Sequence, residues 1–323
     1  MTKSVVAIGG GTGLAVLLRG LKHHTSTGDL ARLSAVVTMS DDGGSSGRLR
    51  REYGVLPPGD IRNCIVALAD DEDLLARLFQ YRFPDGGGLS GHSFGNLFLT
   101  ALTGITGDFY QAILTAESIL SVRGKIYPAT LSDVRLRAVG ASGRRYDGES
   151  AVGHAGERLS QLSLDPAVPP ALPAAVAALR DADLILLGPG SLYTSILPNL
   201  LIPAIREAYI ASRSPKILLM NLMTQPGETD HLSGVDHLEA LERHLGPGSV
   251  DAALVNSTPL PENALRLYAA TGAEPVAVDE EAFAHHGVAV EAVDLVAPGE
   301  LIRHDSDKLA SSALALGERL TRR

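Results

Sequence analysis

The chain has 323 residues, of which 28 are basic and 37 acidic, so it carries a formal net charge of −9. That acidic balance argues against bulk binding of nucleic acid or of an anionic membrane, and the length is sufficient to bury a substantial core. The single cysteine, Cys64, excludes an intramolecular disulfide and a structural zinc cluster of thiolates. Neither a signal-peptide pattern nor an apolar run of about 18 residues occurs, so we expect a cytoplasmic protein.

The first predicted strand, residues 4–8, is a continuous apolar run that is typical of a parallel strand covered on both faces. A turn made of Gly9, Gly10, Gly11, Thr12 and Gly13 follows it, and leucines then recur at helical spacing. The N–H groups of such a turn and the positive end of the helix dipole favour an anion. The turn matches neither the GxGxxG fingerprint nor a P-loop, so a plain strand–helix turn without a ligand is the alternative.

The second predicted strand, 33–38, leads into a polar stretch, 38–63, that we expect to form the centre of the site. This stretch contains five glycines, three serines, four arginines and four acids. Gly43 and Ser45 are suited to donate to phosphate, whereas Asp42 and Asp60 are suited to accept ribose hydroxyls or to hold Mg²⁺. A long solvated loop is the alternative, although structureless loops longer than about 15 residues are uncommon unless they are functional.

A polar helix start follows the predicted helices 60–68 and 73–83. His92, Ser93 and Asn96 stand in a glycine-flanked segment ahead of an otherwise apolar helix, which favours an anion or a reactive oxygen. Helix capping or a buried, satisfied histidine is an equally weighted interpretation for His92. Cys64 lies among apolar residues of the preceding helix, and we interpret it as a core residue.

The middle of the chain alternates apolar and polar residues over 124–150, which predicts a small antiparallel insertion, and a proline-rich linker follows at 164–173. A third glycine-rich loop, made of Gly188, Pro189, Gly190 and Ser191, then comes directly after the predicted strand 183–187. Its proline defines the turn and its glycines leave space for a ligand.

The last third of the chain predicts strands at 216–221, 250–255 and 288–296, with a short one near Val276. Asn221 and Thr224 offer neutral hydrogen-bond partners suited to a base or a sugar. Arg303 precedes the terminal helix, where a bidentate phosphate contact is favourable, and a surface ion pair beside a helix cap is the alternative. The whole pattern predicts an α/β fold in one domain, 1–323, with a mainly parallel sheet and helices on both faces.

Seven segments together resemble the bacterial gluconeogenesis factor family, which is related to the CofD-type 2-phospho-L-lactate transferases and is also described as binding UDP-N-acetylglucosamine. The segments are IGGGTGL at 8–14, VTMSDDGGSSGRLR at 37–50, LPPGDIRNC at 56–64, GHSFGNLFL at 91–99, LLGPGSLYTSILPNLL at 186–201, NLMTQPGET at 221–229 and IRHDSDKLA at 302–310. They span essentially the whole chain, in order.

The resemblance implies a Rossmann-like fold, commonly dimeric, that holds a nucleotide above the strand ends. The implied ligand is a UDP-sugar, with GDP and NAD as alternatives, and segments 10–13 and 188–191 would contact its phosphate or ribose. The regulatory branch of the family acts on carbon flow into peptidoglycan and on cell shape, which implies a partner enzyme of amino-sugar synthesis as well as a second copy of the chain.

The related transferases join a nucleotide-activated three-carbon unit to a deazaflavin with Mg²⁺. By resemblance, Asp42 would stand at the transferases' acidic position near acceptor and metal, with Asp60 in its neighbourhood. The loop over 41–60 has the regulators' form, and the deazaflavin-binding surface is not recognisable. We therefore expect a regulator without turnover, and a Mg²⁺-dependent transferase that uses Asp42 and Asp60 is the alternative. A dinucleotide oxidoreductase is disfavoured, because the fingerprint and its acidic residue about 20 positions on are both missing.

Overall fold

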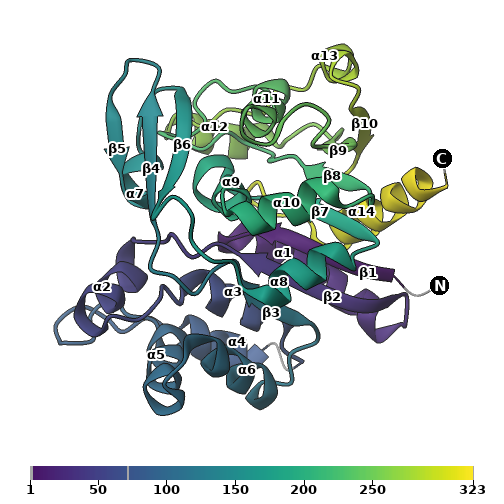
Figure 1. Ribbon diagram of the computed structural model, residues 1–323. Helices are drawn as coiled ribbons and strands as arrows, with labels where there is room; N and C mark the ends of the chain where they lie inside the picture. Colours follow the sequence, from purple (N-terminus) through teal and green to yellow (C-terminus); the bar gives the residue numbers. More distant parts are fainter. Residues whose placement is uncertain (1–2, 71–72, 323) are drawn as a thin grey trace.

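The computed structural model of this protein describes residues 3–70 and 73–322. Its centre is a seven-stranded sheet in which every neighbouring pair is parallel. The strand order is β10-β9-β8-β7-β1-β2-β3 (Figure 1). The strands are β1 (Lys3–Gly9), β2 (Leu30–Val37), β3 (Lys125–Pro128), β7 (Leu184–Leu187), β8 (Lys216–Leu219), β9 (Ala252–Asn256) and β10 (Ala289–Val293).

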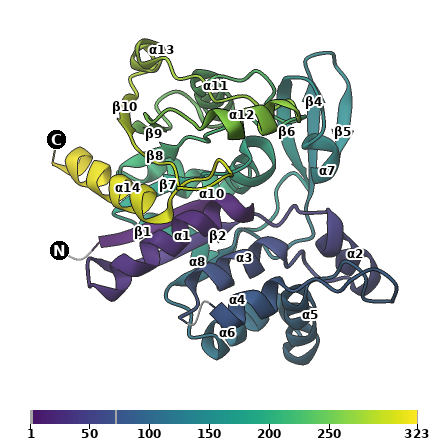
Figure 2. The ribbon, with the colours of Figure 1, turned by 180° about the vertical axis from the view of Figure 1, so that it is seen from behind.

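Helices cover both faces of this sheet, as Figures 1 and 2 show from opposite sides. One face carries α1 (Gly11–Ser26), α3 (Gly59–Leu68) and α14 (Ser306–Thr321), and the other carries α8 (Pro173–Arg180) and α10 (Pro203–Ala211). Because both faces are covered, the central strands are continuous apolar runs, and all four residues of β7 and of β8 are buried. The predicted Rossmann-like α/β fold is confirmed.

The second sheet is antiparallel, with the order β5-β4-β6. Its strands are β4 (Arg135–Gly140), β5 (Arg145–Asp147) and β6 (Leu159–Asp165). The insertion therefore runs over 135–165 and not over 124–150. The segment at its predicted start is β3, which pairs in parallel with β2 at the edge of the main sheet. An edge strand alternates buried and exposed residues, so its pattern looks like that of an antiparallel strand.

The polar stretch 38–63 is largely helical, so the alternative of a long solvated loop is wrong. It contains α2 (Gly44–Tyr53) before α3 begins, and Gly54 ends α2 in the left-handed conformation. Gly47 is needed inside α2, because a Cβ there would collide with the carbonyl of Asp42. Two glycines and two serines lower the helix propensity of this segment, so tertiary packing is needed to stabilise the helix.

The remaining helices differ in burial. They are α4 (Asp73–Gln80), α5 (Phe94–Thr106), α6 (Phe109–Ile119), α7 (Glu149–Val152), α9 (Leu197–Leu200), α11 (Gly234–Leu245), α12 (Glu262–Ala269), α13 (Glu280–His285) and the π-helical turn η1 (Leu192–Ile196). Every residue of α9 and η1 is buried. The prediction of a short strand near Val276 is wrong, because the chain there forms an isolated bridge, between Met223 and Pro275, and no strand. Within residues 3–70 and 73–322, no single helix is long and apolar enough to cross a membrane.

Candidate functional site

The strand order reverses at the boundary between β1 and β7. From β1 the chain builds the sheet outward through β2 and β3, and from β7 it builds in the other direction through β8, β9 and β10. Loops that leave the carboxyl ends of strands on either side of such a switch point diverge, and ligands of open α/β sheets bind in the crevice between them. The glycine turn after β1 and the glycine loop after β7 are the two loops at this switch point.

These two loops approach each other closely. Gly13 lies against the carbonyl of Pro189, where any Cβ would clash, and the Gly188–Pro189 peptide bond is cis. The backbone N–H of Gly190 donates to Oδ1 of Asn221 at 2.9 Å, and Nδ2 of Asn221 donates back to the Gly190 carbonyl at 2.8 Å. A side chain that follows β8 therefore orients the loop that follows β7. Nδ2 of the buried Asn199 similarly donates to the Gly9 carbonyl at 3.1 Å.

A cavity of about 480 Å³ adjoins the loop after β7. Its polar walls are mostly neutral, and Ser191, Thr194, Thr224 and Gln225 line them. Tyr268 also lines the cavity, and its hydroxyl donates to a backbone carbonyl at 3.2 Å, which orients the ring. A polar cavity with one oriented aromatic ring can accommodate a planar base or a sugar, and its volume lies within the range of small-molecule sites.

Carboxyl groups crowd the other side of the crevice. Burial, together with repulsion from Asp41, Asp42 and Asp60, raises the pKa of Glu149 to about 8. Burial and repulsion from Asp41 raise the pKa of Asp60 to about 7, against the opposing effect of the Gly11 N–H, which donates to the Asp60 carboxyl. One N–H of the glycine turn is therefore already used by a carboxyl. An anion that approaches this turn would meet carboxyls that are partly protonated near neutral pH.

Asp42 is held differently from its neighbours. Its carboxylate accepts hydrogen bonds from the backbone N–H groups of Glu149 and Ser150, both at 3.0 Å, and from the Ser150 hydroxyl at 2.7 Å. These donors tie the stretch after β2 to α7. Nowhere in the described part of the chain do three or more His, Cys, Asp or Glu side chains form a group that could hold a metal ion. Mg²⁺ at Asp42 or Asp60 would therefore need ligand phosphates to complete its coordination.

Glu228 is a buried acid that lines the cavity beside the loop after β7. It accepts hydrogen bonds from the backbone N–H groups of Tyr193 at 2.8 Å and Thr194 at 3.2 Å. Burial raises the pKa of Glu228 to about 7, and these two N–H donors together with the Ser191 hydroxyl oppose the rise. Glu228 therefore anchors the start of η1, so that the loop after β7 is held from two sides.

The predicted residues at the start of α5 form a buried hydrogen-bond network. Ser45 Oγ lies 2.9 Å from Nδ1 of His92 and accepts from Nδ2 of Asn96 at 3.1 Å. Arg62 donates to Oγ of Ser93 at 2.6 Å and to Oδ1 of Asn96 at 3.2 Å. Ser93 also caps α5. The structure thus brings these residues together as a clamp between α2, α3 and α5, and their predicted contact with phosphate stays a prediction.

The structure places Arg303 after β10, with its side chain exposed. The next residue, His304, lies with Nε2 3.1 Å from the Met220 carbonyl, directly before Asn221. Asp305, and not Arg303, caps α14 by accepting from two backbone N–H groups. Arg303 is therefore near the end of β8. The helix that follows it, α14, begins beside Gly20 in the second half of α1, so the start of α14 does not adjoin the glycine turn after β1. A phosphate contact from Arg303 stays a prediction.

Comparison with known proteins assigns the family. Residues 5–296 match the family described as 2-phospho-L-lactate transferase CofD. A Bacillus subtilis protein named gluconeogenesis factor is 47% identical over 308 residues, which are 95% of this chain and 96% of that protein. The chain belongs to the gluconeogenesis factor family. A Nostoc protein named putative gluconeogenesis factor is 50% identical over 313 residues, which are 96% of this chain and 68% of that protein.

The fold of the gluconeogenesis factor family member from Bacillus halodurans agrees with this assignment. Its crystal structure, described as that of a member of the UPF0052 family, superposes with a TM-score of 0.92 at 45% identity. The match covers 97% of this chain and all of the solved chain. The resemblance predicted from the seven segments is therefore confirmed at the level of family and fold.

Several residues of this site were not predicted from the sequence. Glu228 lies in a segment that had been singled out, NLMTQPGET, but a glutamate in a polar loop gives no signal of burial. Glu149 and Tyr268 come from α7 and α12, which no glycine motif marks. Only the tertiary structure brings these residues to the ends of β7 and β8.

Proposed function

We propose that this chain binds a nucleotide sugar of the UDP-N-acetylglucosamine type at the β1–β7 switch point and acts as a regulator without turning the ligand over. In this proposal the protein controls carbon flow into cell-wall precursors, and thereby cell shape, from the cytoplasm. It acts as a homodimer and through a partner enzyme of amino-sugar synthesis. The names of its relatives and the segments shared with the regulatory branch support this role.

The observation that carries the proposal is the meeting of two glycine loops beside a neutral polar cavity. The loops after β1 and β7 leave the sheet where the strand order reverses, and α1 begins in the first of them, so its N-terminus can favour a diphosphate. The cavity of about 480 Å³ then offers hydroxyl, amide and aromatic groups to the uncharged parts of the ligand.

A second candidate is a Mg²⁺-dependent transferase of a phosphorylated three-carbon unit from a nucleotide carrier. The carboxyl cluster favours it, because Glu149 and Asp60 have pKa values of about 8 and 7 and are suited to proton transfer near neutral pH. In that mechanism Asp42 would orient the acceptor or the metal, and the ligand's own phosphates would complete the metal coordination.

Titration calorimetry with UDP-N-acetylglucosamine, GDP and NAD, each with Mg²⁺ and with EDTA, separates the two candidates. Binding of the UDP-sugar that is independent of metal supports the regulator. Binding of GDP that requires Mg²⁺, together with product formed from a deazaflavin acceptor, would overturn it.

A matched pair of variants then locates the ligand. Asn221→Ala removes both hydrogen bonds that orient Gly190, so we expect UDP-sugar affinity to fall by about five- to thirtyfold. Asn256→Ala is the control, because Asn256 ends the next strand and bonds only its own turn and the segment after β10. Equal losses in both variants would contradict a site at the switch point.

A further inference from the structure

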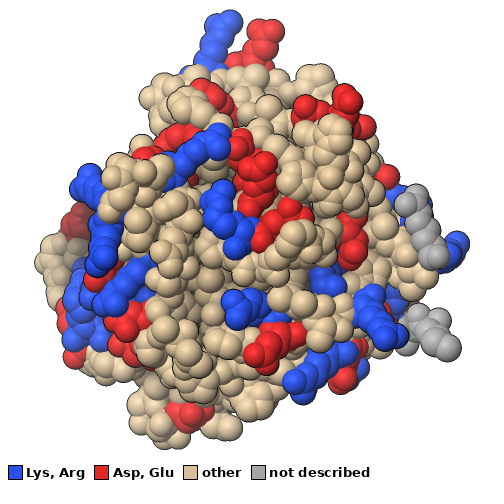
Figure 3. Space-filling model, turned by 45° about the horizontal axis from the view of Figure 1, so that its top comes forward, with Lys and Arg blue, Asp and Glu red and all other residues tan. Residues whose placement is uncertain are grey.

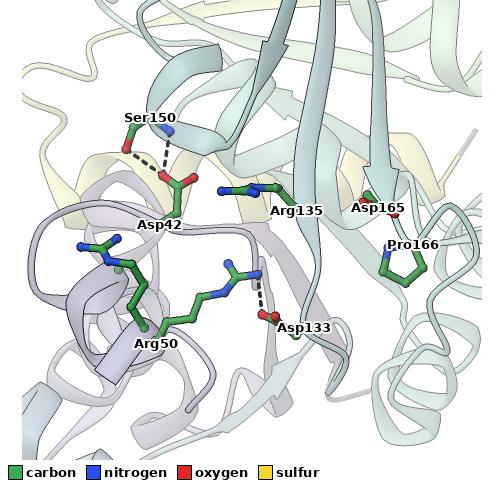
Figure 4. Close-up of a pocket in the computed structure, with 9 residues that line it drawn as sticks. Asp42, Arg50, Asp133, Arg135, Ser150, Asp165 and Pro166 are labelled. Carbon is green, nitrogen blue, oxygen red and sulfur yellow. Dashed lines mark hydrogen bonds and ion pairs between the residues drawn. The ribbon is translucent and has the colours of Figure 1, made fainter. Parts of the chain in front are cut away.

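A second cavity, of about 670 Å³, lies between α2 and the small antiparallel sheet. It is separated from the nucleotide crevice by the start of α7: Ser150 lines this cavity, whereas Glu149 lines the cavity beside the loop after β7. Arg50 and Arg51 reach it from α2 and Arg135 from β4, and we call it the arginine cavity (Figure 4). Figure 3 shows basic side chains interspersed with acidic ones on the face that it draws.

The carboxylates around the arginine cavity are already engaged. Asp133 forms an ion pair with Arg50, whose guanidinium also donates to the Val134 carbonyl at 2.7 Å. Asp165 pairs at 2.7 Å with Arg137, which does not line the cavity. Asp42 is satisfied by the three donors of α7 described above. The lining therefore carries three guanidiniums and three carboxylates, and each of these carboxylates already has a hydrogen-bond or ion-pair partner.

Two guanidiniums remain available to a ligand. Arg51 makes no ion pair or hydrogen bond with any described residue. Arg135 pairs with Asp147 at 3.1 Å, but both side chains are more than half exposed, so this pair is screened by water and contributes little. In Figure 4, Arg135 projects from the small sheet across the cavity toward Asp42. The cavity therefore presents two guanidiniums whose N–H donors are free or only weakly engaged, in a lining whose formal charges balance.

The chemistry of these groups identifies the class of ligand. Guanidiniums bind phosphate through paired N–H donors, and two of them supply enough donors for the oxygens of a phosphomonoester. The volume exceeds that of orthophosphate and lies within the range of small-molecule sites. The carboxylates of Asp133 and Asp165 in the same lining are acceptors suited to ligand hydroxyls.

We propose that the arginine cavity binds a phosphorylated polyol of the sugar phosphate class, at a site distinct from the nucleotide crevice. The phosphate lies between Arg51 and Arg135, and the ligand hydroxyls face Asp133 and Asp165. This inference does not depend on nucleotide binding, because none of the residues that carry it belongs to the glycine loops.

Equilibrium dialysis with labelled glucose 6-phosphate tests the proposal. We expect saturable binding at or below about 1 mM, no comparable binding of glucose, and weaker binding of inorganic phosphate. The double variant Arg51→Glu with Arg135→Glu should weaken binding by at least about tenfold. Arg145→Glu is the charge-matched control, because Arg145 is exposed on β5 outside the cavity, and it should leave binding unchanged.

Three results would overturn the proposal: no saturable binding to the wild-type protein, equal loss in the double variant and in Arg145→Glu, or glucose and inorganic phosphate binding as tightly as glucose 6-phosphate. Thermal melting of each variant confirms folding, which all three exposed substitutions should preserve. Excess UDP-N-acetylglucosamine should leave the bound glucose 6-phosphate in place. Competition between the two would mean that glucose 6-phosphate binds in the nucleotide crevice, and would overturn the proposal of a separate site. Failure of the UDP-sugar itself to bind would refute the proposed function and leave this site intact.

Discussion

Replacing Glu228 by glutamine should make the protein more stable at alkaline pH. Glu228 is only 6% exposed and accepts from two backbone N–H groups through one carboxyl oxygen, Oε1. The amide oxygen of glutamine can accept both of these hydrogen bonds, so Glu228→Gln removes the ionisable group and keeps the packing. The variant therefore isolates the free-energy cost of a buried charge.

The sign and size of the effect follow from the pKa. Burial raises the pKa of Glu228 from 4.5 to about 7, so the fold favours the protonated form. Below about pH 4.5 both folded and unfolded chains are protonated and the cost is absent; it grows as the pH rises and is complete above about pH 7. At about 1.36 kcal/mol per unit, the shift corresponds to roughly 3 kcal/mol.

Urea denaturation followed by circular dichroism, between about pH 5 and about pH 8, measures this effect. We expect Glu228→Gln to exceed the wild type in unfolding free energy by roughly 3 kcal/mol at the upper end and by much less at the lower end. Glu207→Gln, at an exposed position on α10, is the control and should follow the wild type throughout. A Glu228→Gln variant that parallels the wild type at every pH would refute the buried-charge reasoning.

Three further predictions concern the same region. Gly13→Ala places a Cβ against the Pro189 carbonyl and should lower the free energy of unfolding, measured by urea denaturation, by about 1–3 kcal/mol. The control Gly104→Ala lies in open space on α5 and should raise it by about 0.5–1 kcal/mol. Equal effects of the two substitutions would contradict the close approach of Gly13 to Pro189. Asn96→Ala leaves Ser45 without its donor inside a buried network and should cost about 1–3 kcal/mol by the same assay, so a cost near zero would show that the network is not satisfied as described. UDP-sugar affinity measured by calorimetry should change less than about twofold when EDTA replaces Mg²⁺, and a larger fall would favour the transferase.

The parallel sheet could be predicted because its local signals agree with the fold. The apolar runs that form β1 and β7 are each followed by glycines, and both features arise from the same topology, in which buried strands end in turns at one edge. The core position of Cys64 was also correct, since the residue is fully buried on α3. The glycine loops were thus located before their partners in space were known.

The remaining parts depend on contacts between distant segments. Helix α2 forms although its own sequence favours a loop, because Ser45, Ser46, Gly47 and Leu49 are buried against the rest of the protein. The network of His92 and its neighbours was equally ambiguous, since a polar residue at a helix start gives the same signal whether it meets a ligand or another helix. Net charge likewise gave no sign of the arginine cavity, whose arginines come from separate elements.

A crystal structure of the protein with UDP-N-acetylglucosamine tests the central claim most directly. We expect diphosphate oxygens within hydrogen-bond distance of backbone N–H groups in segments 10–13 or 188–191, with the rest of the ligand in the cavity beside Tyr268. Density for the diphosphate in the arginine cavity, or on any surface away from the ends of β1 and β7, would contradict it.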